Sequence, residues 1–521
     1  MPLLVLITTS GTGSRLESKT KYTNKSLVKV GDKYAICYIF DLYPKDTEFI
    51  VTTGYYGQQV KDFCRMAYPE LSIRFIDIDK YEGEGSSLGY SMLQAKEYIQ
   101  RPFIFHCCDT ILKEYPFPSV LSGNMVLVSS CKDIRSYMGI KLRTNKLNVK
   151  CFTKKGELCD YSYKGIVYIQ DYRIFWECLQ SIYSMNMYDQ TLNDVYAMQS
   201  MLANDSKITY TIVDNVFDTG NIYSYKETCE NFKSTHDVLE KDDESLCFLD
   251  TKVIKFFANK DMNLKRIYRA NILHPFTPTI FSHSDNFMCM EYVQGTLLSE
   301  CTGYGEIYNL MEWAHTNLWS HTIQNTKYRD VCNRFYKVKT ENRLKGLPFL
   351  DKECNTINTI NTGSIYDLLT RTPFEYLSTD IFGKFHGDFI LDNIMKVESK
   401  YVVLDWRQEF DTELDVGDVY YDLAKLKHNI IFNHKNITND LYSVDYIQNQ
   451  VNIDLKCNYG LMYQLEDYTK FTEKYKYSIN KINILVGIIW LNMAPLYQGK
   501  LSEFLFYFGK LHLYLAIQAL P

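Results

Sequence analysis

The fold of the first half of the chain is decided by one stretch near its start, Leu3-Leu4-Val5-Leu6-Ile7-Thr8-Thr9-Ser10-Gly11-Thr12-Gly13-Ser14-Arg15. Its apolar run predicts a buried strand, and the glycines predict a tight turn directly after it. Backbone N–H groups in such a turn can point at anionic oxygens, and Arg15 can bind two oxygens at once. The G-K-[ST] ending of a Walker A loop is missing. A strand-to-helix corner also needs glycine, so the loop alone leaves a purely structural role open.

Short apolar runs and helical patterns alternate after this loop. Strands are predicted at residues 48–52, 72–78, 103–107 and 125–129, and helices at 56–68 and 88–99. Such alternation predicts mostly parallel strands with helices on both faces. A β-rich stretch at 139–169 interrupts the alternation, so the sheet is expected to be mixed. We predict an α/β domain with a doubly wound, mostly parallel sheet over residues 1–235.

A polar and charged stretch marks the predicted domain boundary, which we place at a linker of residues 236–244. New strands follow at 245–249, 253–257 and 287–292, and the rest of the chain is dominated by helical patterns. Strands first and helices later predict a small sheet lobe packed on a helical lobe. The second domain is therefore expected to be a two-lobed α+β unit of residues 245–521, with a small lobe at 245–295 and a helical lobe at 296–521.

Composition narrows the class of protein. The chain has 521 residues and a formal net charge of −5, so a nucleic-acid partner is not expected. The expected partners are small-molecule substrates. The most apolar late stretch, 482–496, is interrupted by Asn483, Asn492 and Pro495, so no membrane span is expected. Fifteen cysteines without a C-x-x-C pair, and no visible signal peptide, predict a cytoplasmic protein. The oligomeric state stays open.

Polar residues recur where the predicted elements of the first domain end. Lys25 follows Arg15 by 10 residues, and Gly83-Glu84-Gly85-Ser86-Ser87-Leu88 is a second glycine-rich loop ahead of a helix. Asp109 follows an apolar strand, and Asp218 lies close to the end of the domain. Each carboxylate alone is as typical of a turn or a solvated loop. Their combination with two cations favours a shared phosphate and metal site.

With these residues the first half resembles the sugar-phosphate nucleotidylyltransferase family, including its phosphocholine cytidylyltransferase-like branch. The family's phosphate loop reads roughly G-x-G-[ST]-R and is followed by K-P-L, where this chain has Ser26 in place of proline. The resemblance covers residues 1 to about 230. It implies that the triphosphate of a nucleotide is held by Gly11, Thr12, Gly13 and Arg15, and that the charge of the α-phosphate or the acceptor phosphate is neutralised by Lys25. It also implies a second loop that faces the base, with Gly85 and Ser86, and a Mg²⁺ ion held by Asp109 and Asp218.

The most specific motif of the second half is His386-Gly387-Asp388-Phe389-Ile390-Leu391-Asp392-Asn393, which Asp405 follows at the end of another predicted strand. Metal-assisted phosphoryl transfer needs one carboxylate to accept the proton of the attacking hydroxyl, here Asp388. It also needs side chains that hold the metal ions, here Asn393 and Asp405. The motif resembles the aminoglycoside phosphotransferase and choline kinase family, whose catalytic loop reads H-G-D-x-x-x-x-N. The resemblance covers roughly residues 245–521.

Further parts of that family's pattern follow in order. Lys255, on a predicted strand, resembles the lysine that binds the α- and β-phosphates of ATP. Glu291 and Val293 resemble the hinge that contacts adenine, and residues 417–423 resemble a supporting G-D-x-x-x-D-L element. One part is missing, because the helix expected within residues 262–272 contains no glutamate to orient Lys255. The acidic partner of Lys255 is therefore not identified by the sequence.

The two sites together predict a bifunctional enzyme, since a kinase makes a phosphomonoester and a nucleotidylyltransferase consumes one. The acceptor is expected to be a sugar, a polyol or an amino alcohol. ATP and a second nucleoside triphosphate, with CTP favoured, are the expected co-substrates, and the product is expected to be an activated precursor for a surface glycan. One alternative is a single active nucleotidylyltransferase with a degenerate kinase-like module that binds substrate or regulates. Another is a nucleotide-sensing scaffold without turnover.

Overall fold

The computed structural model describes residues 2–118, 121–131, 135, 137–144, 146–236, 241–301, 303–456 and 460–521, the last segment without the side chains of 460–462. Contacts between Cα atoms divide the chain into two compact units. Unit 1 comprises Met1–Lys260 and Phe281–Tyr292, and unit 2 comprises Asp261–Ile280 and Val293–Pro521. Each unit is described by itself.

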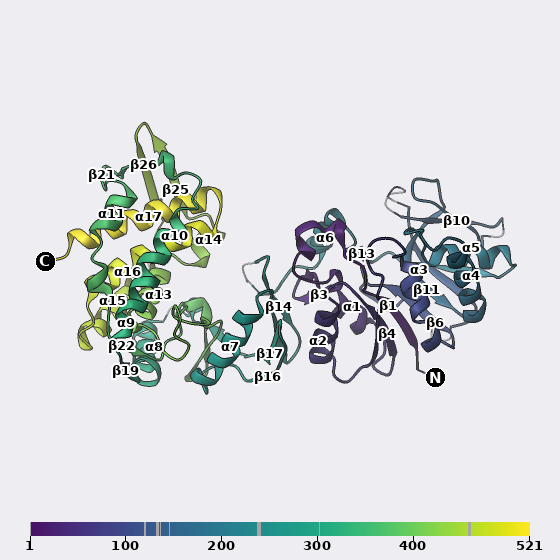
Figure 1. Ribbon diagram of the computed structural model, residues 1–521, viewed down its shortest axis with the longest axis horizontal. Helices are drawn as coiled ribbons and strands as arrows, with labels where there is room; N and C mark the ends of the chain where they lie inside the picture. Colours follow the sequence, from purple (N-terminus) through teal and green to yellow (C-terminus); the bar gives the residue numbers. More distant parts are fainter. Residues whose placement is uncertain are drawn as a thin grey trace. The chain divides into compact units, whose positions relative to one another are not determined.

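Unit 1 is built on a nine-stranded mixed sheet (Figure 1). Its central strands are parallel: β1 pairs with β4 and β6, and β4 pairs with β5. The antiparallel strands β9 to β11 lie beyond β6, and β8 and β12 pair beside β11. The strands of the sheet are β1 (Leu4–Thr8), β4 (Glu48–Thr53), β5 (Ser72–Asp77), β6 (Phe103–Cys107), β8 (Asn124–Ser129), β9 (Gly139–Leu142), β10 (Val149–Thr153), β11 (Tyr161–Ile169) and β12 (Ile208–Ile212). The predicted mixed α/β fold with a mostly parallel central sheet is confirmed for this region.

Helices cover both faces of this sheet because its strands are apolar on both sides. In β1, Val5 and Ile7 belong to one core, together with side chains of α1 and α2. Leu4 and Leu6 belong to the opposite core, with side chains of α3, α4 and α5. The helices are α1 (Ala35–Leu42), α2 (Gly57–Ala67), α3 (Leu88–Gln94), α4 (Tyr172–Met185), α5 (Asp194–Ala203) and α6 (Ile222–Asn231).

A second, four-stranded sheet also belongs to unit 1. It contains β14 (Glu244–Phe248), β15 (Lys252–Phe257), β16 (Ile280–His283) and β17 (Phe287–Glu291), in the order β14-β15-β17-β16. Cys247, Ile254 and Phe287 share a core with α1 and α2, and the Tyr34 hydroxyl lies 2.7 Å from the Ser245 hydroxyl. These contacts group the four-stranded sheet with unit 1. The sequence, in contrast, predicts this sheet as the small lobe of the second domain. Of the predicted linker, residues 237–240 lie outside the described residues, and the predicted domain division stays a prediction.

Unit 2 is mainly helical, with short β pairs. Its first helix, α7 (Lys260–Leu273), confirms the helix expected within residues 262–272. The catalytic-loop motif precedes the hairpin of β23 (Ile394–Val397) and β24 (Lys400–Val403), to which β18 (Thr296–Leu297) adds. The hairpin β25 (Tyr442–Ile447) and β26 (Gln450–Leu455) was not foreseen. The longer helices are α8 (Glu306–Ala314), α9 (Lys327–Asn333), α10 (Lys339–Leu344), α11 (Ile365–Arg371), α13 (Val419–Ile431), α15 (Gly460–Lys474), α16 (Ile479–Met493) and α17 (Gly499–Gln518).

The apolar helix α16 packs against α17 in the core of unit 2. A Cβ at Gly487 would lie 2.8 Å from the Leu513 backbone nitrogen, and one at Gly509 would lie 2.8 Å from that of Leu491. Only glycine allows this close approach. The stretch Ile479–Leu496 is long and apolar enough to cross a membrane, with a mean hydropathy of 1.4, but 67% of it is buried inside the structure. Such burial is typical of a core helix.

Candidate functional site

The glycine loop after β1 holds a lysine directly beneath it. Gly13 has a left-handed backbone (φ +68°), and a Cβ there would lie 2.9 Å from the Cβ of Lys25 and 3.0 Å from Cγ2 of Thr20. A side chain at this position would therefore both strain the backbone and displace Lys25. The loop and Lys25 form one packed unit, as the predicted phosphate site requires.

Asn24 fixes this arrangement, and the sequence analysis did not single it out. The side chain is fully buried, and its Nδ2 donates to the carbonyl oxygens of Thr9 at 2.9 Å and Tyr55 at 2.6 Å. Its Oδ1 accepts from the backbone N–H and the hydroxyl of Ser26. Asn24 thereby ties the glycine loop to the turn that carries Lys25. The Asn before a short turn is the sequence signal that could have identified it.

Strand pairing brings the two predicted metal ligands of unit 1 together. The strand β7 (Thr110–Leu112) begins directly after Asp109, and it pairs with β13 (Val216–Asp218) so that Asp218 faces Thr110. The N–H of Thr219 donates to the Asp109 carbonyl at 2.8 Å. A Cβ added at Gly220 would lie 3.0 Å from Oδ2 of Asp109 and equally 3.0 Å from Oδ1 of Asp218. The two carboxylates therefore converge on the same small space.

The charges around this space are strongly coupled. Burial raises the pKa of Asp109, but Lys25, the Cys107 thiol and Arg15 outweigh burial, so that the pKa lies below its usual value. Burial and the charge of Asp109 raise the pKa of Asp218, although Tyr137 donates to Asp218 Oδ2 at 2.6 Å. Burial lowers the pKa of Lys25, but Cys108, Asp109 and Cys107 outweigh the effect of burial, so the pKa of Lys25 is raised. Lys25 is therefore an ammonium, and Asp109 is a carboxylate.

A cavity of about 300 Å³ opens beside these residues. It brings together seven residues that the sequence predicts for the site: Gly11, Thr12, Gly13, Arg15, Lys25, Ser86 and Asp109. Gly85 and Asp218 do not line it, although Gly220, which touches both aspartates, does. Ser86 reaches the cavity because its N–H and hydroxyl bond to the Gly83 carbonyl, which folds the second loop back ahead of α3.

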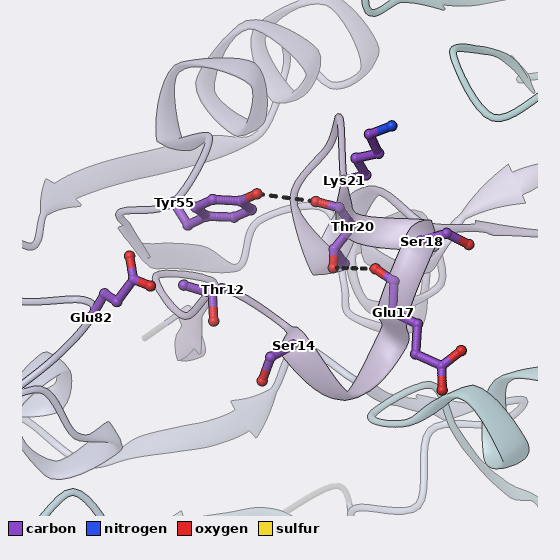
Figure 2. Close-up of a pocket in the computed structure, with 8 residues that line it drawn as sticks. All are labelled: Thr12, Ser14, Glu17, Ser18, Thr20, Lys21, Tyr55 and Glu82. Carbon is purple, nitrogen blue, oxygen red and sulfur yellow. Dashed lines mark hydrogen bonds between the residues drawn. The ribbon is translucent and has the colours of Figure 1, made fainter.

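A neighbouring hollow of about 380 Å³ shares Thr12 and Ser14 with this cavity, and Figure 2 shows the residues that line it. Its wall is held by Tyr55, whose hydroxyl donates to the Thr20 carbonyl at 3.2 Å. The hollow contains neither Lys25 nor Asp109. The cavity that contains them is therefore the candidate site.

The donor atoms of the candidate site fit Mg²⁺. Asp109 and Asp218 offer hard carboxylate oxygens at one point, and burial and then the charge of Asp109 raise the pKa of Asp218, which a bound cation would counteract. Within the described part of the chain, no group of three or more His, Cys, Asp or Glu residues could hold a metal. Phosphate oxygens or waters would complete the coordination of an ion held by two aspartates.

One more cation, the exposed Lys155, is acted on by the charges of this site, and the sequence did not indicate it. Lys155 lies in the turn between β10 and β11, and its pKa is lowered by burial and by Arg15, while Asp218 and Asp109 act in the opposite direction. Lys155 is therefore close to the same charges as Arg15. Its place in a hairpin turn, which ordinarily points to solvent, hid this role.

In unit 2 the predicted catalytic loop is rigidly held. Asp422 of α13 accepts the backbone N–H groups of His386 and Gly387, each at 2.7 Å. His386 donates from Nε2 to the Leu404 carbonyl at 2.8 Å, and its Nδ1 accepts the N–H of Asp388. Burial lowers the pKa of His386 to about 4, so the ring is neutral and this tautomer is stable. The supporting role predicted for residues 417–423 is confirmed at Asp422.

The three predicted catalytic and metal-binding residues of unit 2 lie together. Asn393 donates from Nδ2 to Oδ2 of Asp388 at 3.2 Å, and its carbonyl accepts the N–H of Leu404 at 2.7 Å, next to Asp405. Asp388 Oδ1 is ion-paired with Lys425 at 2.6 Å, and Oδ1 of Asp405 is ion-paired with Arg266 of α7. A metal ion bound at Oδ1 of Asp405 would have to displace this arginine, so the donor set fits Mg²⁺ less well than that of unit 1.

A carboxylate partner of Lys255 lies on a strand, Glu244 of β14. Lys255 Nζ lies 3.0 Å from Oε2 of Glu244 on the neighbouring strand β14. The helix α7 instead provides Arg266 to Asp405. Lys255 and Glu291 belong to unit 1, whereas Val293 belongs to unit 2, and their predicted roles in ATP binding stay predictions.

Comparison with solved structures gives neighbours for the N-terminal half. No protein-family model and no curated protein matches the chain. A CTP:phosphocholine cytidylyltransferase of Streptococcus pneumoniae is 17% identical, over 45% of this chain and 100% of that chain, with a TM-score of 0.39. An inositol-1-phosphate CTP transferase of T. maritima is 13% identical, over 46% and 98%, with a TM-score of 0.36. A nucleoside-diphosphate-sugar pyrophosphorylase of Vibrio cholerae is 14% identical, over 44% and 100%, also with a TM-score of 0.36. Because the identities and scores are this low, the functional assignment rests on the geometry of the site.

Proposed function

We propose that unit 1 transfers a nucleotidyl group from a nucleoside triphosphate to a phosphomonoester and releases pyrophosphate. The observation that carries this proposal is the convergence of Asp109 and Asp218 beside Lys25 and Arg15, in the cavity beneath the glycine loop. An oxygen of the acceptor phosphate forms a bond to the α-phosphorus, and the bond from the α-phosphorus to the bridging oxygen breaks. Pyrophosphate leaves with that oxygen, and no proton is transferred.

The residues of the chain supply what this reaction needs. The N–H groups of the glycine loop and the guanidinium of Arg15 bind the triphosphate, and the ammonium of Lys25 offsets the negative charge that meets at the α-phosphorus. Asp109 and Asp218 would hold Mg²⁺, which as a Lewis acid polarises the phosphate oxygens when bound. Lys155, which is influenced by the charges of Asp109 and Asp218, would attract the acceptor phosphate. CTP is the favoured nucleotide and a sugar or polyol phosphate the favoured acceptor.

The test is a pyrophosphate assay of the full chain with a panel of phosphomonoesters and the four common ribonucleoside triphosphates. At least one pair is expected to release pyrophosphate. Lys25→Met, which keeps the aliphatic stem that packs on Gly13, should reduce this rate about 10²–10³-fold. Lys45→Met, at an exposed lysine, is the matched control and should not. Absence of pyrophosphate with every pair, or full activity of Lys25→Met, would refute the proposal.

For unit 2 we propose phosphorylation of the acceptor that unit 1 then uses, so that the chain makes a nucleotide-activated precursor of a surface glycan. The supporting observation is the fixed catalytic loop with Asn393 bound to Asp388. The acceptor hydroxyl oxygen bonds to the γ-phosphorus of ATP, the bond to the β–γ bridging oxygen breaks, and Asp388 accepts the hydroxyl proton. The Arg266–Asp405 ion pair favours the alternative, a degenerate module that binds substrate or regulates. ATP consumption with an acceptor panel separates the two.

A further inference from the structure

A group of four cationic side chains gathers next to Asp388 in unit 2, and the proposed reaction does not use it. We refer to Lys339, Arg343, Arg407 and Lys425 as the cationic cluster. Lys339 and Arg343 lie one helical turn apart on α10, so they share a face of that helix. Lys425 comes from α13, and Arg407 follows the Asp405 turn. Three separate segments of the chain thus bring positive charge to one place.

The packing around Phe335 fixes two of these cations. Lys339 Nζ lies 3.9 Å from the centre of the Phe335 ring, and Cζ of Arg407 lies 5.0 Å from the same ring. Arg407 is also held against the catalytic loop, since its N–H donates to the His386 carbonyl at 3.0 Å and its Cβ would touch a Cβ at Gly387. The cluster is therefore a rigid extension of the catalytic loop.

The carboxylates that face the cluster do not neutralise it. Asp388 is paired with Lys425 at 2.6 Å, and Asp411 is paired with Arg334 at 2.8 Å. Lys339, Arg343 and Arg407 have no carboxylate within ion-pair distance in the described part of the chain. The Lys339 ammonium makes no hydrogen bond to any described residue. Its pKa is held well below the usual value by burial and then by Arg407, Arg343 and Lys425.

Gathering like charges in a partly desolvated place is unfavourable unless an anion binds there. Of the cluster, Lys425 contacts Asp388, at Oδ1, whereas Asn393 contacts Oδ2. An acceptor bound by the cluster would therefore meet Asp388 at the oxygen that the predicted metal ligand Asn393 does not contact.

We propose that the cationic cluster binds an anionic acceptor, a sugar or polyol that already carries a carboxylate or a phosphate group, and that it selects against sugars and polyols without such a group and against cationic amino alcohols. The inference rests on the proposed phosphotransfer by unit 2 and specifies its substrate class. Lys339 binds the anionic group of the acceptor, and the positive charges of Arg343 and Arg407 add to the electrostatic attraction on that group. Asp388 receives the hydroxyl proton.

Binding to the full chain, measured by calorimetry without ATP, tests the cluster independently of catalysis. The probes are glycerate for the carboxylate, glycerol 3-phosphate for the phosphate, glycerol as the neutral arm and choline as the cationic arm. At least one anion is expected to bind 10-fold or more tightly than glycerol and choline. Lys339→Met and Arg343→Met should each weaken that binding at least 10-fold, whereas Lys345→Met, at an exposed lysine beyond the end of α10, should not. Because Lys339 and Arg343 lie in unit 2, their effect separates this site from the phosphate site of unit 1.

Three outcomes would overturn the proposal: equal binding of glycerol or choline, anion binding that both variants leave unchanged, or variants that weaken ATP instead of the acceptor. In turnover assays Lys339→Met should raise KM for the anionic acceptor at least 10-fold with kcat and the KM for ATP nearly unchanged. If an anion binds through Lys339 but no acceptor is ever phosphorylated, the anion site is upheld and the phosphotransfer function is refuted.

Discussion

The two carboxylate sites of this chain differ in what neutralises them. In unit 1, Asp109 and Asp218 converge on one point; Lys25 and Arg15 offset the charge of Asp109, but burial and then the charge of Asp109 keep the pKa of Asp218 raised. In unit 2, Asp388 and Asp405 each have a cation of their own, Lys425 and Arg266. The first arrangement attracts a divalent ion, whereas the second already contains its counter-charges.

This difference predicts that the activities of the two sites respond differently to the Mg²⁺ concentration and to the substitution of a charged side chain. A metal at Asp109 and Asp218 relieves an existing repulsion, so it should bind with little competition from the protein. A metal at Asp405 has to exchange with Arg266, which costs part of its binding free energy. The two activities should therefore be separable by single substitutions, and the substitutions below test the comparison in order of decreasing effect.

The largest effect is expected for Asp388→Asn. The amide cannot accept the hydroxyl proton, so phosphorylation of the acceptor should fall about 10²–10⁴-fold. Pyrophosphate release from a supplied phosphomonoester should be unchanged. ATP consumption and pyrophosphate release, measured on the same preparation, check both statements. Asp445→Asn, an exposed position on β25, is the control, and undiminished phosphorylation by Asp388→Asn would show that unit 2 is not a kinase of this type.

Asp109→Asn should have the reverse pattern. It removes one of the two converging carboxylates, and we expect pyrophosphate release to fall about 10²–10³-fold while phosphorylation continues. The exposed Asp214 gives the matched control Asp214→Asn, which should keep both activities. Loss of both activities in Asp109→Asn, with a normally folded protein, would contradict the separation of the sites.

Arg266→Met tests the competition between arginine and metal directly. If Arg266 occupies Asp405, its removal should lower the Mg²⁺ concentration that half-saturates phosphorylation by roughly 3–10-fold, and pyrophosphate release should keep its Mg²⁺ dependence. Arg329→Met removes an arginine from a surface ion pair with Asp380 and serves as the control. An unchanged or higher Mg²⁺ requirement in Arg266→Met would mean that Asp405 does not bind the metal.

A smaller effect is expected on the pH dependence of stability. Burial raises the pKa of Asp194 in unit 1 to about 6, and that of Asp422 in unit 2 to about 6 as well. Both exceed the ordinary value of an unfolded aspartate, so folding binds a proton between about pH 4 and 6, and the contribution of each group to stability falls as the pH rises through this window. Asp194→Asn should abolish about 1–3 kcal/mol of this pH dependence. Thermal unfolding of the variant and the parent at pH 4 to 7 checks the sign, and identical pH profiles would contradict it.

The sequence predicted the fold of unit 1 well because its strands carry a strong local signal. The predicted strand at 103–107 agrees with β6 (Phe103–Cys107), and the helix at 56–68 with α2 (Gly57–Ala67). The sequence could not show that the sheet of β14 to β17 contacts α1 and α2. That contact depends on Cys247 and Phe287, which are apolar residues like any other in a strand.

The candidate sites were predicted where a motif fixes several residues at once. Asp388, Asn393 and Asp405 follow from one spacing, Asp109 follows from the end of a predicted strand, and Asp218 follows from the order of residues in the resembling family. Glu244, Arg266 and Lys155 were missed, because each reaches its site from an element that has no motif of its own. Such residues are specified by tertiary packing, which a single sequence does not reveal.

The most direct measurement for the central claim is the Mg²⁺ dependence of pyrophosphate release by the parent chain and by Asp218→Asn. If Asp109 and Asp218 hold Mg²⁺, release by the parent should saturate with Mg²⁺ and stop when a chelator removes the ion, and Asp218→Asn should need far more Mg²⁺ or show no turnover. Release that persists in the chelator, or an Asp218→Asn chain with the Mg²⁺ response of the parent, would contradict this claim.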